Sequence, residues 1–275
     1  MPLPEWNRIA VGAHSIGYRQ AGAGPPVVLL HGFLCDSRSW RTQLEGLSDA
    51  FSVIAWDAPG AGASSDPPET FTITDWAHVL ARFLDAVKVG PAHFVGLSWG
   101  GVLAQELYRL EPNRVRGLIL ADTYAGWKGS LSAAVAEQRL GRCRRESLLP
   151  AAEFVRLWVP NDFFTAYASA ELVNEMSSIV GAFHPHGFRL MAQSLAESDT
   201  IAELQCIGVP TLLVWGDSDA RSPVDVVGAQ FRDAIHGSEM VVLERAGHLS
   251  NMERPSEFNA HVRRFCSERG GHTER

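Results

Sequence analysis

The 275-residue sequence predicts an α/β protein: a mostly parallel central sheet flanked by helices, with a helical cap inserted between two sheet strands. Apolar runs of four to eight residues alternate with longer amphipathic segments, which is the pattern of strands and covering helices. Most runs are rich in Val, Ile and Leu without polar alternation, as expected of parallel strands covered on both faces. One long stretch, residues 124–204, contains no convincing strand and several helical patterns.

The elements of the core follow in a regular order. Residues 8–22 are short, alternating and turn-rich, which predicts an antiparallel edge of the sheet. The apolar runs that follow predict strands at 25–32, 51–60, 92–98, 115–122, 210–217 and 238–245. Segments with helical spacing predict helices at 74–89, 101–110, 224–235 and 256–267.

The stretch from Tyr124 to Leu204 breaks this order. Its helical patterns lie at 130–142, 151–158, 169–183 and 186–198. We therefore predict a core domain of residues 1–123 and 205–275 and a helical cap, or lid, of residues 124–204. The sequence shows no internal repeat and no low-complexity linker, so cap and core are predicted to form one compact unit.

Composition narrows the classes of function. Hydrophobic residues make up 46% of the chain, enough for a substantial core, and a net charge of −7 gives no reason to expect nucleic-acid binding. The chain starts without a basic and then apolar segment, and no window approaches ~18 consecutive apolar residues, so we expect no signal peptide and no membrane span. The four cysteines form no C-x-x-C pair and no H-E-x-x-H is present, so we expect no metal and no cofactor. The default expectation is a cytoplasmic protein.

Chemically distinctive residues follow the predicted strands. In open α/β sheets, ligands bind beyond the carboxyl ends of the strands, so these residues are expected to converge on one rim. They are the segments 31–33 (HGF), 57–65 (DAPGAGASS), Ser98, Asp122, 216–223 (GDSDARSP) and 246–251 (AGHLSN).

The segment around Ser98 reads G-L-S-W-G, with Gly96 and Gly100 on either side of the serine. A G-x-S-x-G pattern where a strand meets a helix resembles the nucleophile elbow of the α/β-hydrolase fold family. The turn is so tight that side chains two residues before and after the serine would collide. The helix that begins at Trp99 points its free N–H groups and positive dipole end toward Ser98.

A serine hydroxyl needs a base to take its proton, and the base needs a carboxylate that orients it. His248 is the candidate base and Asp219 the candidate acid, in the chain order Ser98, Asp219, His248 that the family implies. In the family pattern the acid lies three residues after the glycine and four before the proline, as Asp219 does. Asp122 is a rival for the acid, while Asp217 is expected to cap a turn.

The resemblance also implies an oxyanion hole and a pocket. The backbone N–H groups of Trp99, which follows the nucleophile, and Phe33, in the H-G-F segment, are the predicted oxyanion donors. Such pockets are mostly apolar and lie between cap and triad in this family. We predict a lining of Leu34, Trp127, Trp158, Phe163 and Leu249.

Other polar residues are given structural roles. His31 is expected to orient its loop, and Asp57 to hold a turn with Gly60 and Gly62. His93 is expected to face solvent or to be hydrogen-bonded. The arginine-rich run 139–147 (Arg139 to Arg145) is interpreted as a solvated helix face, with an anionic carrier such as acyl carrier protein or coenzyme A as the alternative partner.

The resemblance, which covers residues 9–265, is to the capped serine members of the family such as carboxylesterases and enol-lactone hydrolases. It implies a serine hydrolase that cleaves a small, moderately apolar carboxylic ester or lactone through an acyl-enzyme. The same residues could instead cleave a C–C bond or form peracids, or the fold could serve as a ligand receptor with slow turnover. The sequence leaves the acyl group, the alcohol and the oligomeric state open.

Overall fold

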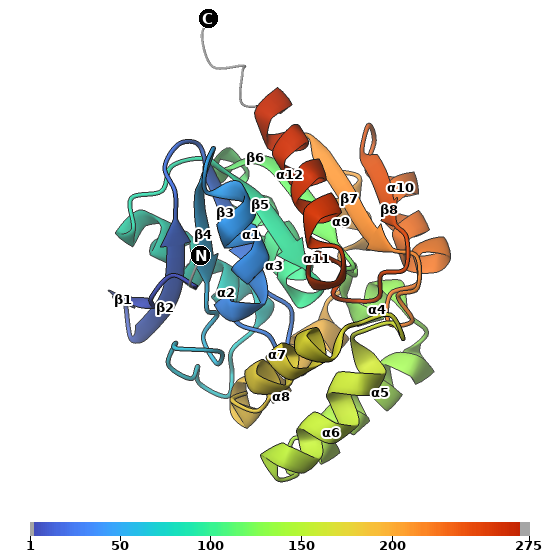
Figure 1. The fold of residues 1–275 in the computed structure, drawn as a ribbon. Helices are drawn as coiled ribbons and strands as arrows, with labels where there is room; N and C mark the ends of the chain where they lie inside the picture. The colour runs from blue at the N-terminus through green and yellow to red at the C-terminus, as the bar shows by residue number, and fades with distance from the viewer. Residues whose placement is uncertain (1–2, 270–275) are drawn as a thin grey trace, which may run out of the picture.

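The computed structural model describes residues 3–269 and contains one eight-stranded sheet in the order β1-β2-β4-β3-β5-β6-β7-β8 (Figure 1). The first strands, β1 and β2, pair antiparallel with each other and β2 pairs antiparallel with β4, while the other pairs are parallel. The predicted mostly parallel sheet with an antiparallel edge is thereby confirmed. The strands are β1 Asn7–Val11, β2 His14–Ala21, β3 Pro26–Leu30, β4 Ser52–Trp56, β5 Ala92–Leu97, β6 Val115–Ala121, β7 Thr211–Gly216 and β8 Glu239–Leu243.

Helices cover both faces of the sheet, which is why the interior strands β5 and β7 are buried along their whole length. On the near face in Figure 1, α1 (Arg41–Leu47) packs against α12 (Pro255–Arg269). The helices α2 (Ile73–Ala86) and α3 (Trp99–Leu110) form a second packed pair. The predicted helix 224–235 begins as a π-helical turn, Val224–Gly228, and continues as α10 (Ala229–Ala234). The sequence does not predict α1, which is shorter than two helical turns and contains Thr and Gly.

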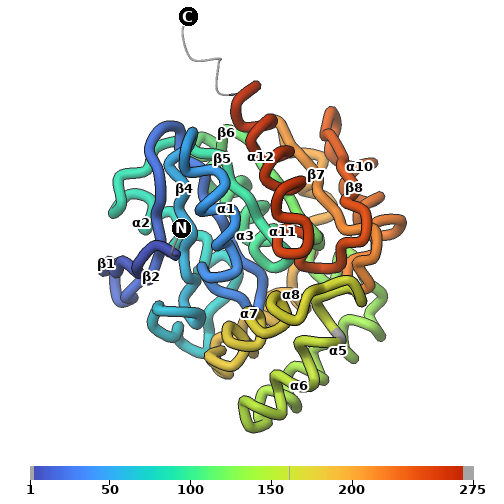
Figure 2. Tube along the Cα trace, in the orientation of Figure 1, coloured from blue at the N-terminus to red at the C-terminus, as the bar shows by residue number. Residues whose placement is uncertain are grey.

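Six helices lie between β6 and β7, and residues 122–210 contain no strand. Figures 1 and 2 show α7 and α8 next to the core and α5 and α6 on their outer side, in agreement with the contacts of α8 with α3 and of α5 with α8. The helices are α4 Gly126–Ser130, α5 Ala133–Glu146, α6 Ala151–Asp162, α7 Ala170–Val180, α8 Pro185–Glu197 and α9 Ile201–Leu204. The division into core and cap domains remains a prediction, and its ends, residues 1–2 and 270–275, lie outside the described residues.

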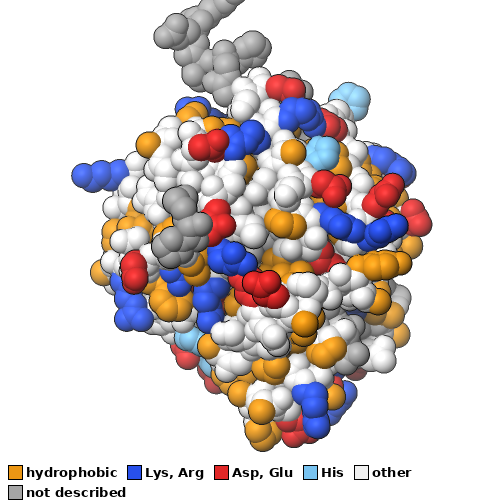
Figure 3. Space-filling model, viewed as in Figure 1, with side chains coloured by type: hydrophobic (Ala, Val, Ile, Leu, Met, Phe, Trp, Pro, Cys, Tyr) orange, Lys and Arg blue, Asp and Glu red, His pale blue; other side chains and the backbone are white. Residues whose placement is uncertain are grey.

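The surface carries acidic and basic side chains side by side on the face that Figure 3 shows, with no large patch of one sign. Within residues 3–269, every helix is too short or too polar to cross a bilayer. The same residues contain no cluster of three or more His, Cys, Asp or Glu side chains suited to holding a metal ion.

Candidate active site

Ser98 occupies a strained turn between β5 and α3. Its backbone has φ 53° and ψ −117°, a conformation that residues other than Gly rarely adopt. A Cβ at Gly96 would lie 2.5 Å from the carbonyl oxygen of Gly100, and one at Gly100 would lie 2.1 Å from that of Leu30. Both positions therefore require glycine. This is the local reason that the sequence places a single hydroxyl between two side-chain-free residues.

Ser98, His248 and Asp219 lie together at the carboxyl ends of β5, β8 and β7. The hydroxyl of Ser98 lies 2.9 Å from Nε2 of His248, and Nδ1 of His248 lies 2.8 Å from Oδ2 of Asp219. The three residues are 2%, 3% and 3% exposed, so the chain of hydrogen bonds is nearly sealed from solvent. With Nδ1–H donating to the carboxylate, Nε2 is free to accept the serine proton.

Asp219 is held as a carboxylate by its surroundings. Burial by itself would raise its pKa, but the charge of His248 and the hydrogen bonds from His248 and Ser222 outweigh burial and hold the pKa below its usual value. The Ser222 hydroxyl donates to Oδ2 at 2.5 Å, and the backbone N–H groups of Arg221 and Ser222 donate to Oδ1 at 2.8 and 3.1 Å. The acid is thus fixed in place by its own loop.

His248 has a lowered pKa, chiefly because burial disfavours the imidazolium. Asp219 opposes this shift, and the charges of Arg221 and Arg139 add to it. The imidazole is therefore neutral, and able to accept a proton, to lower pH than a free histidine.

The two rival carboxylates make other contacts. Asp122 accepts hydrogen bonds from the Gly216 backbone N–H at 2.8 Å and from the Ser250 hydroxyl at 2.5 Å, and burial and the charge of Asp219 raise its pKa well above the usual value. Asp217 accepts from the Ser218 hydroxyl and the Ala246 backbone, as a turn-capping residue does. Of these three carboxylates, Asp219 alone is hydrogen-bonded to the His248 ring.

The loop after β3 lies against the serine. A Cβ at Gly32 would lie 3.3 Å from the Cβ of Ser98 and 3.8 Å from its hydroxyl oxygen. The structure records no hydrogen bond from the backbone N–H of Phe33 or Trp99 to another described residue. His31 fixes this loop, because its Nδ1 bonds the Gly32 carbonyl at 2.8 Å and its Nε2 accepts from the Ala58 N–H at 3.0 Å.

The predicted pocket residues belong to the hydrophobic interior. Leu34, Trp127, Trp158, Phe163 and Leu249 are all buried. The Phe33 ring meets Trp127 and Trp158 edge-on, at centroid distances of 6.2 and 6.1 Å, and stacks on Phe188 at 5.4 Å. Sequence reasoning does not identify Phe188, on α8, as part of this cluster.

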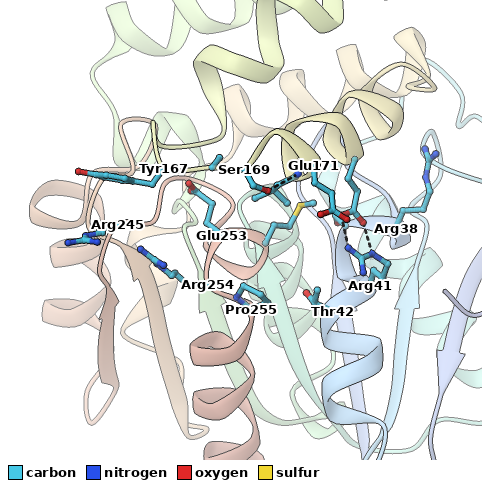
Figure 4. Close-up of a pocket in the computed structure, with 15 residues that line it drawn as sticks. Arg38, Arg41, Thr42, Tyr167, Ser169, Glu171, Arg245, Glu253, Arg254 and Pro255 are labelled. Carbon is cyan, nitrogen blue, oxygen red and sulfur yellow. Dashed lines mark hydrogen bonds and ion pairs between the residues drawn. The ribbon is translucent and has the colours of Figure 1, made fainter. Parts of the chain in front are cut away.

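A groove of about 360 Å³ opens elsewhere on the boundary between α7 and the core (Figure 4). Its lining is highly charged, with Arg41 paired to Glu175 at 2.7 Å and with Arg245, Glu253 and Arg254 at the opposite end. None of Ser98, Asp219 and His248 lines it. The groove and the buried serine are therefore separate features.

The interpretation of the arginine run as a solvated face is wrong for two of its members. Arg139 donates to the Tyr124 hydroxyl at 3.0 Å and to the Arg221 carbonyl at 2.9 Å. Arg142 forms an ion pair with Asp162 at 2.8 Å and lies over the Trp158 ring at 4.1 Å. The helix turns these two side chains inward, toward partners that lie far away in the sequence.

Two further expectations can be compared with the structure. Asp57 accepts hydrogen bonds from the backbone of Ser37 and Ala63, so it holds the turn as expected. His93 does not face solvent: it is buried against the Phe265 ring at 5.8 Å, and its Nδ1 has no partner among the described residues. Burial, together with the charge of Arg116, lowers the pKa of His93 to about 4.

Sequence reasoning misses Arg221, although the quoted segment GDSDARSP contains it. Its Nη1 is 2.7 Å from Asp162, and the residue is 9% exposed. The segment GDSDARSP contains no pattern that predicts burial of this arginine side chain, so the sequence could not have identified it.

Comparison with known proteins places these features in a family. A model of the alpha/beta hydrolase fold family matches residues 25–255. The chain is 32% identical over 223 residues to 3-oxoadipate enol-lactonase 2 of Acinetobacter baylyi, covering 80% of each protein. Among solved structures, the malate-bound thermophilic esterase from Thermogutta terrifontis superposes with a TM-score of 0.87 at 29% identity, covering 96% of this chain and 99% of that one.

One curated relative is longer than this chain. The dihydrolipoyllysine-residue acetyltransferase component of the acetoin cleaving system of Cupriavidus necator is 29% identical over 88% of this chain, and the match spans 63% of that protein.

Proposed function

Because the chain belongs to the alpha/beta hydrolase fold family, we propose that it is a serine hydrolase that cleaves small, moderately apolar carboxylic esters or lactones. One observation carries the proposal. Ser98, on a strained turn, is hydrogen-bonded at 2.9 Å to a buried His248 that is in turn hydrogen-bonded at 2.8 Å to Asp219. This is the arrangement of a nucleophile, its base and the group that orients the base.

In the first half of the proposed reaction, the Ser98 oxygen attacks the substrate carbonyl and its proton passes to Nε2 of His248. The resulting imidazolium is stabilised by Asp219. The negative oxygen of the tetrahedral intermediate accepts hydrogen bonds from the backbone N–H groups of Phe33 and Trp99, which have no recorded partner. His248 then gives its proton to the leaving alkoxide, and an acyl-Ser98 ester remains.

In the second half, water replaces the alcohol. His248 takes a proton from the water as its oxygen attacks the acyl carbon, and the same oxyanion donors hold the second intermediate. The proton on Nε2 returns to the Ser98 oxygen as the acyl–oxygen bond breaks, releasing the carboxylic acid.

The substrate class is supported by the surroundings of Ser98 and by the relatives. The side chains beside Phe33 are mainly aromatic, which suits an apolar acyl group. The names of two relatives describe an enol-lactonase and an esterase. Both a lactone and an open ester present the same carbonyl to the serine.

The test is turnover of 4-nitrophenyl esters with acyl chains of two to twelve carbons by the wild type and Ser98→Ala. We expect the wild type to hydrolyse short and medium chains and Ser98→Ala to lose about 10⁴-fold or more in kcat. The acyl chain length that is hydrolysed best would then indicate the size of the acyl-binding site.

Each other outcome has a definite meaning. Equal turnover by both proteins would identify a different nucleophile. Turnover by neither protein would contradict the ester hydrolase proposal and favour C–C bond cleavage or a receptor role.

A further inference from the structure

The loop that carries His248 is bonded to a carboxylate that the proposed reaction does not use. Glu253 lies shortly after His248, at the end of the short helix α11 (Ser250–Glu253). Its Oε2 accepts a hydrogen bond at 2.6 Å from the backbone N–H of Gly247, the residue directly before His248. A bond from a charged oxygen to the backbone next to the base limits how far the base can move.

The other oxygen of Glu253 faces the cap side. Oε1 accepts hydrogen bonds from the backbone N–H of Thr165 at 2.9 Å and from the Thr165 hydroxyl at 2.6 Å. Thr165 belongs to the segment between α6 and α7, residues 163–169, which we call the cap connector. Figure 4 shows the Glu253 side chain directed toward the part of this connector that carries Tyr167 and Ser169. Donors on two sides thus hold both oxygens of the half-buried carboxylate.

The cap connector also contacts the loop of the base directly. The backbone N–H of Leu249 donates to the carbonyl oxygen of Phe163 at 3.3 Å. A Cβ at Gly247 would lie 3.0 Å from this carbonyl oxygen and 3.0 Å from Oε2 of Glu253, so a glycine permits the close approach. The residue before His248 is therefore held by Glu253, and the residue after it by the connector.

This support has a function because the ring of His248 exchanges partners in the proposed reaction. Its Nε2 starts 2.9 Å from the Ser98 hydroxyl, then donates to the leaving alkoxide and later accepts a proton from water. These partners change from step to step, so they cannot hold the ring in the position that each step needs. Asp219 fixes the Nδ1 side, and the backbone must fix the rest.

A second glutamate of the same groove joins cap and core away from the base. Glu175, on α7, is hydrogen-bonded to Arg41 of α1 through both of its oxygens, at 2.7 and 2.8 Å. Both glutamates therefore bind the cap to the core. Of the two, Glu253 alone is hydrogen-bonded to the loop of His248, so the pair separates a role in cap packing from a role at the base.

We propose that Glu253 is a positioning residue for His248, whose place it sets by holding the backbone at Gly247. A carboxylate suits this role because it offers an acceptor oxygen to each of the two sides. An amide in its place would turn an NH₂ group toward one of the N–H donors. The inference rests on the proposed function, because the place of the imidazole is critical only where it transfers protons.

The test measures kcat and KM of Glu253→Gln for a 4-nitrophenyl ester that the wild type hydrolyses, with Glu175→Gln as the matched control. His248 serves both halves of the proposed reaction, so its displacement should slow acylation and deacylation together. We therefore expect kcat to fall at least about tenfold in Glu253→Gln while KM stays within about twofold. Glu175→Gln should keep both constants within about twofold of the wild type, even if it lowers stability.

A purely structural role of Glu253 predicts other results. A smaller fall of kcat in Glu253→Gln, or a change in KM as large as that in kcat, would overturn the positioning role. Equal falls in Glu253→Gln and Glu175→Gln would do the same, because cap packing would then account for both. If Glu253→Gln does not fold, Glu253→Asp must meet the same criterion, since its carboxylate is one methylene too short to reach both sides.

Failure of the proposed function is recognised separately. If the wild type hydrolyses no ester, ¹H NMR follows the proton between Nδ1 of His248 and Asp219, which resonates far downfield. We expect this resonance in the wild type and in Glu175→Gln, and a shifted or lost resonance in Glu253→Gln. A resonance that is unchanged in Glu253→Gln, or absent from the wild type, would overturn the positioning role.

Discussion

The strand ends of the sheet and the cap side of the same site are built differently. At the strand ends, each functional group is fixed by its own loop: Ser98 by the turn between Gly96 and Gly100, and Asp219 by the two backbone N–H groups that follow it. On the cap side, Asp162 on α6 holds both Arg142 of α5 and Arg221, which lies on the core loop after β7. The chemistry proposed for Ser98 thus depends on local backbone geometry, whereas the packing of the cap against the core depends on side chains brought together from distant segments.

This difference fits the roles proposed for the two regions. A nucleophile and its base must be held within a few tenths of an ångström, which strained turns and short loops provide. Side chains that only recognise a substrate can differ between relatives that share the same core. We therefore expect core changes to act on kcat and cap changes to act on stability and specificity.

The largest effect should come from the acid at the strand ends. Asp219→Asn would remove the charge that stabilises the His248 imidazolium and would favour the wrong tautomer, so kcat should fall about 10⁴-fold. Asp122→Asn is the matched control: it changes the rival acid, which contacts Gly216 and Ser250 instead, and should cost less than about tenfold. Steady-state kinetics of both variants, with folding verified by circular dichroism, provide the measurement. A larger loss of kcat in Asp122→Asn than in Asp219→Asn would show that Asp122, after β6, is the acid.

The same contrast explains what could be predicted from the sequence. The positions of the strands along the chain, most of the helices that follow them and the placement of Ser98, Asp219 and His248 at strand ends follow from apolar runs and from the residues directly after them. Each of these signals lies within a few residues of the group that it positions.

The cap contacts have no such signal. Arg139 bonds to Arg221 across 82 positions, and Arg221 bonds to Asp162 across 59. From the sequence alone, an arginine-rich helix is expected to be exposed to solvent. The acidic and aromatic groups that its arginines contact lie in other segments, so the sequence around the helix does not reveal them. For the same reason, the aromatic cap residues can be named as pocket candidates, but their mutual packing cannot be predicted.

An intermediate effect, on stability, should come from the shared carboxylate of the cap. Asp162→Ala would leave the mostly buried Arg221 without its ion-pair partner, and Asp162 is itself only 9% exposed in its side chain. Removing one partner of such a pair should lower the free energy of unfolding by about 3–5 kcal/mol. Urea denaturation measures this change.

The control for this prediction comes from α5, the helix that carries Arg142. Arg144→Ala changes an exposed arginine that bonds only to Gln193 in the recorded contacts, and should stay within about 0.5 kcal/mol of the wild type. Equal losses in Asp162→Ala and Arg144→Ala would show that the buried pair contributes nothing specific to the cap.

The smallest expected effect is a shift in the pH profile, because a cap residue, Arg139, acts on the pKa of His248 at the strand ends. The base must be neutral to take the serine proton, so kcat/KM should fall as the pH falls through this pKa. Burial lowers the pKa, and the charges of Arg221 and Arg139 lower it further, so the acid limb should lie below the value of about 6.5 for an unperturbed histidine. Arg139→Gln removes one of these positive charges, which should raise the pKa and move the acid limb to higher pH, whereas Arg144→Gln should leave it in place. Profiles of kcat/KM against pH for the three proteins provide the measurement. An acid limb that does not move in Arg139→Gln would mean that Arg139, the cap residue of the two, does not act on the base.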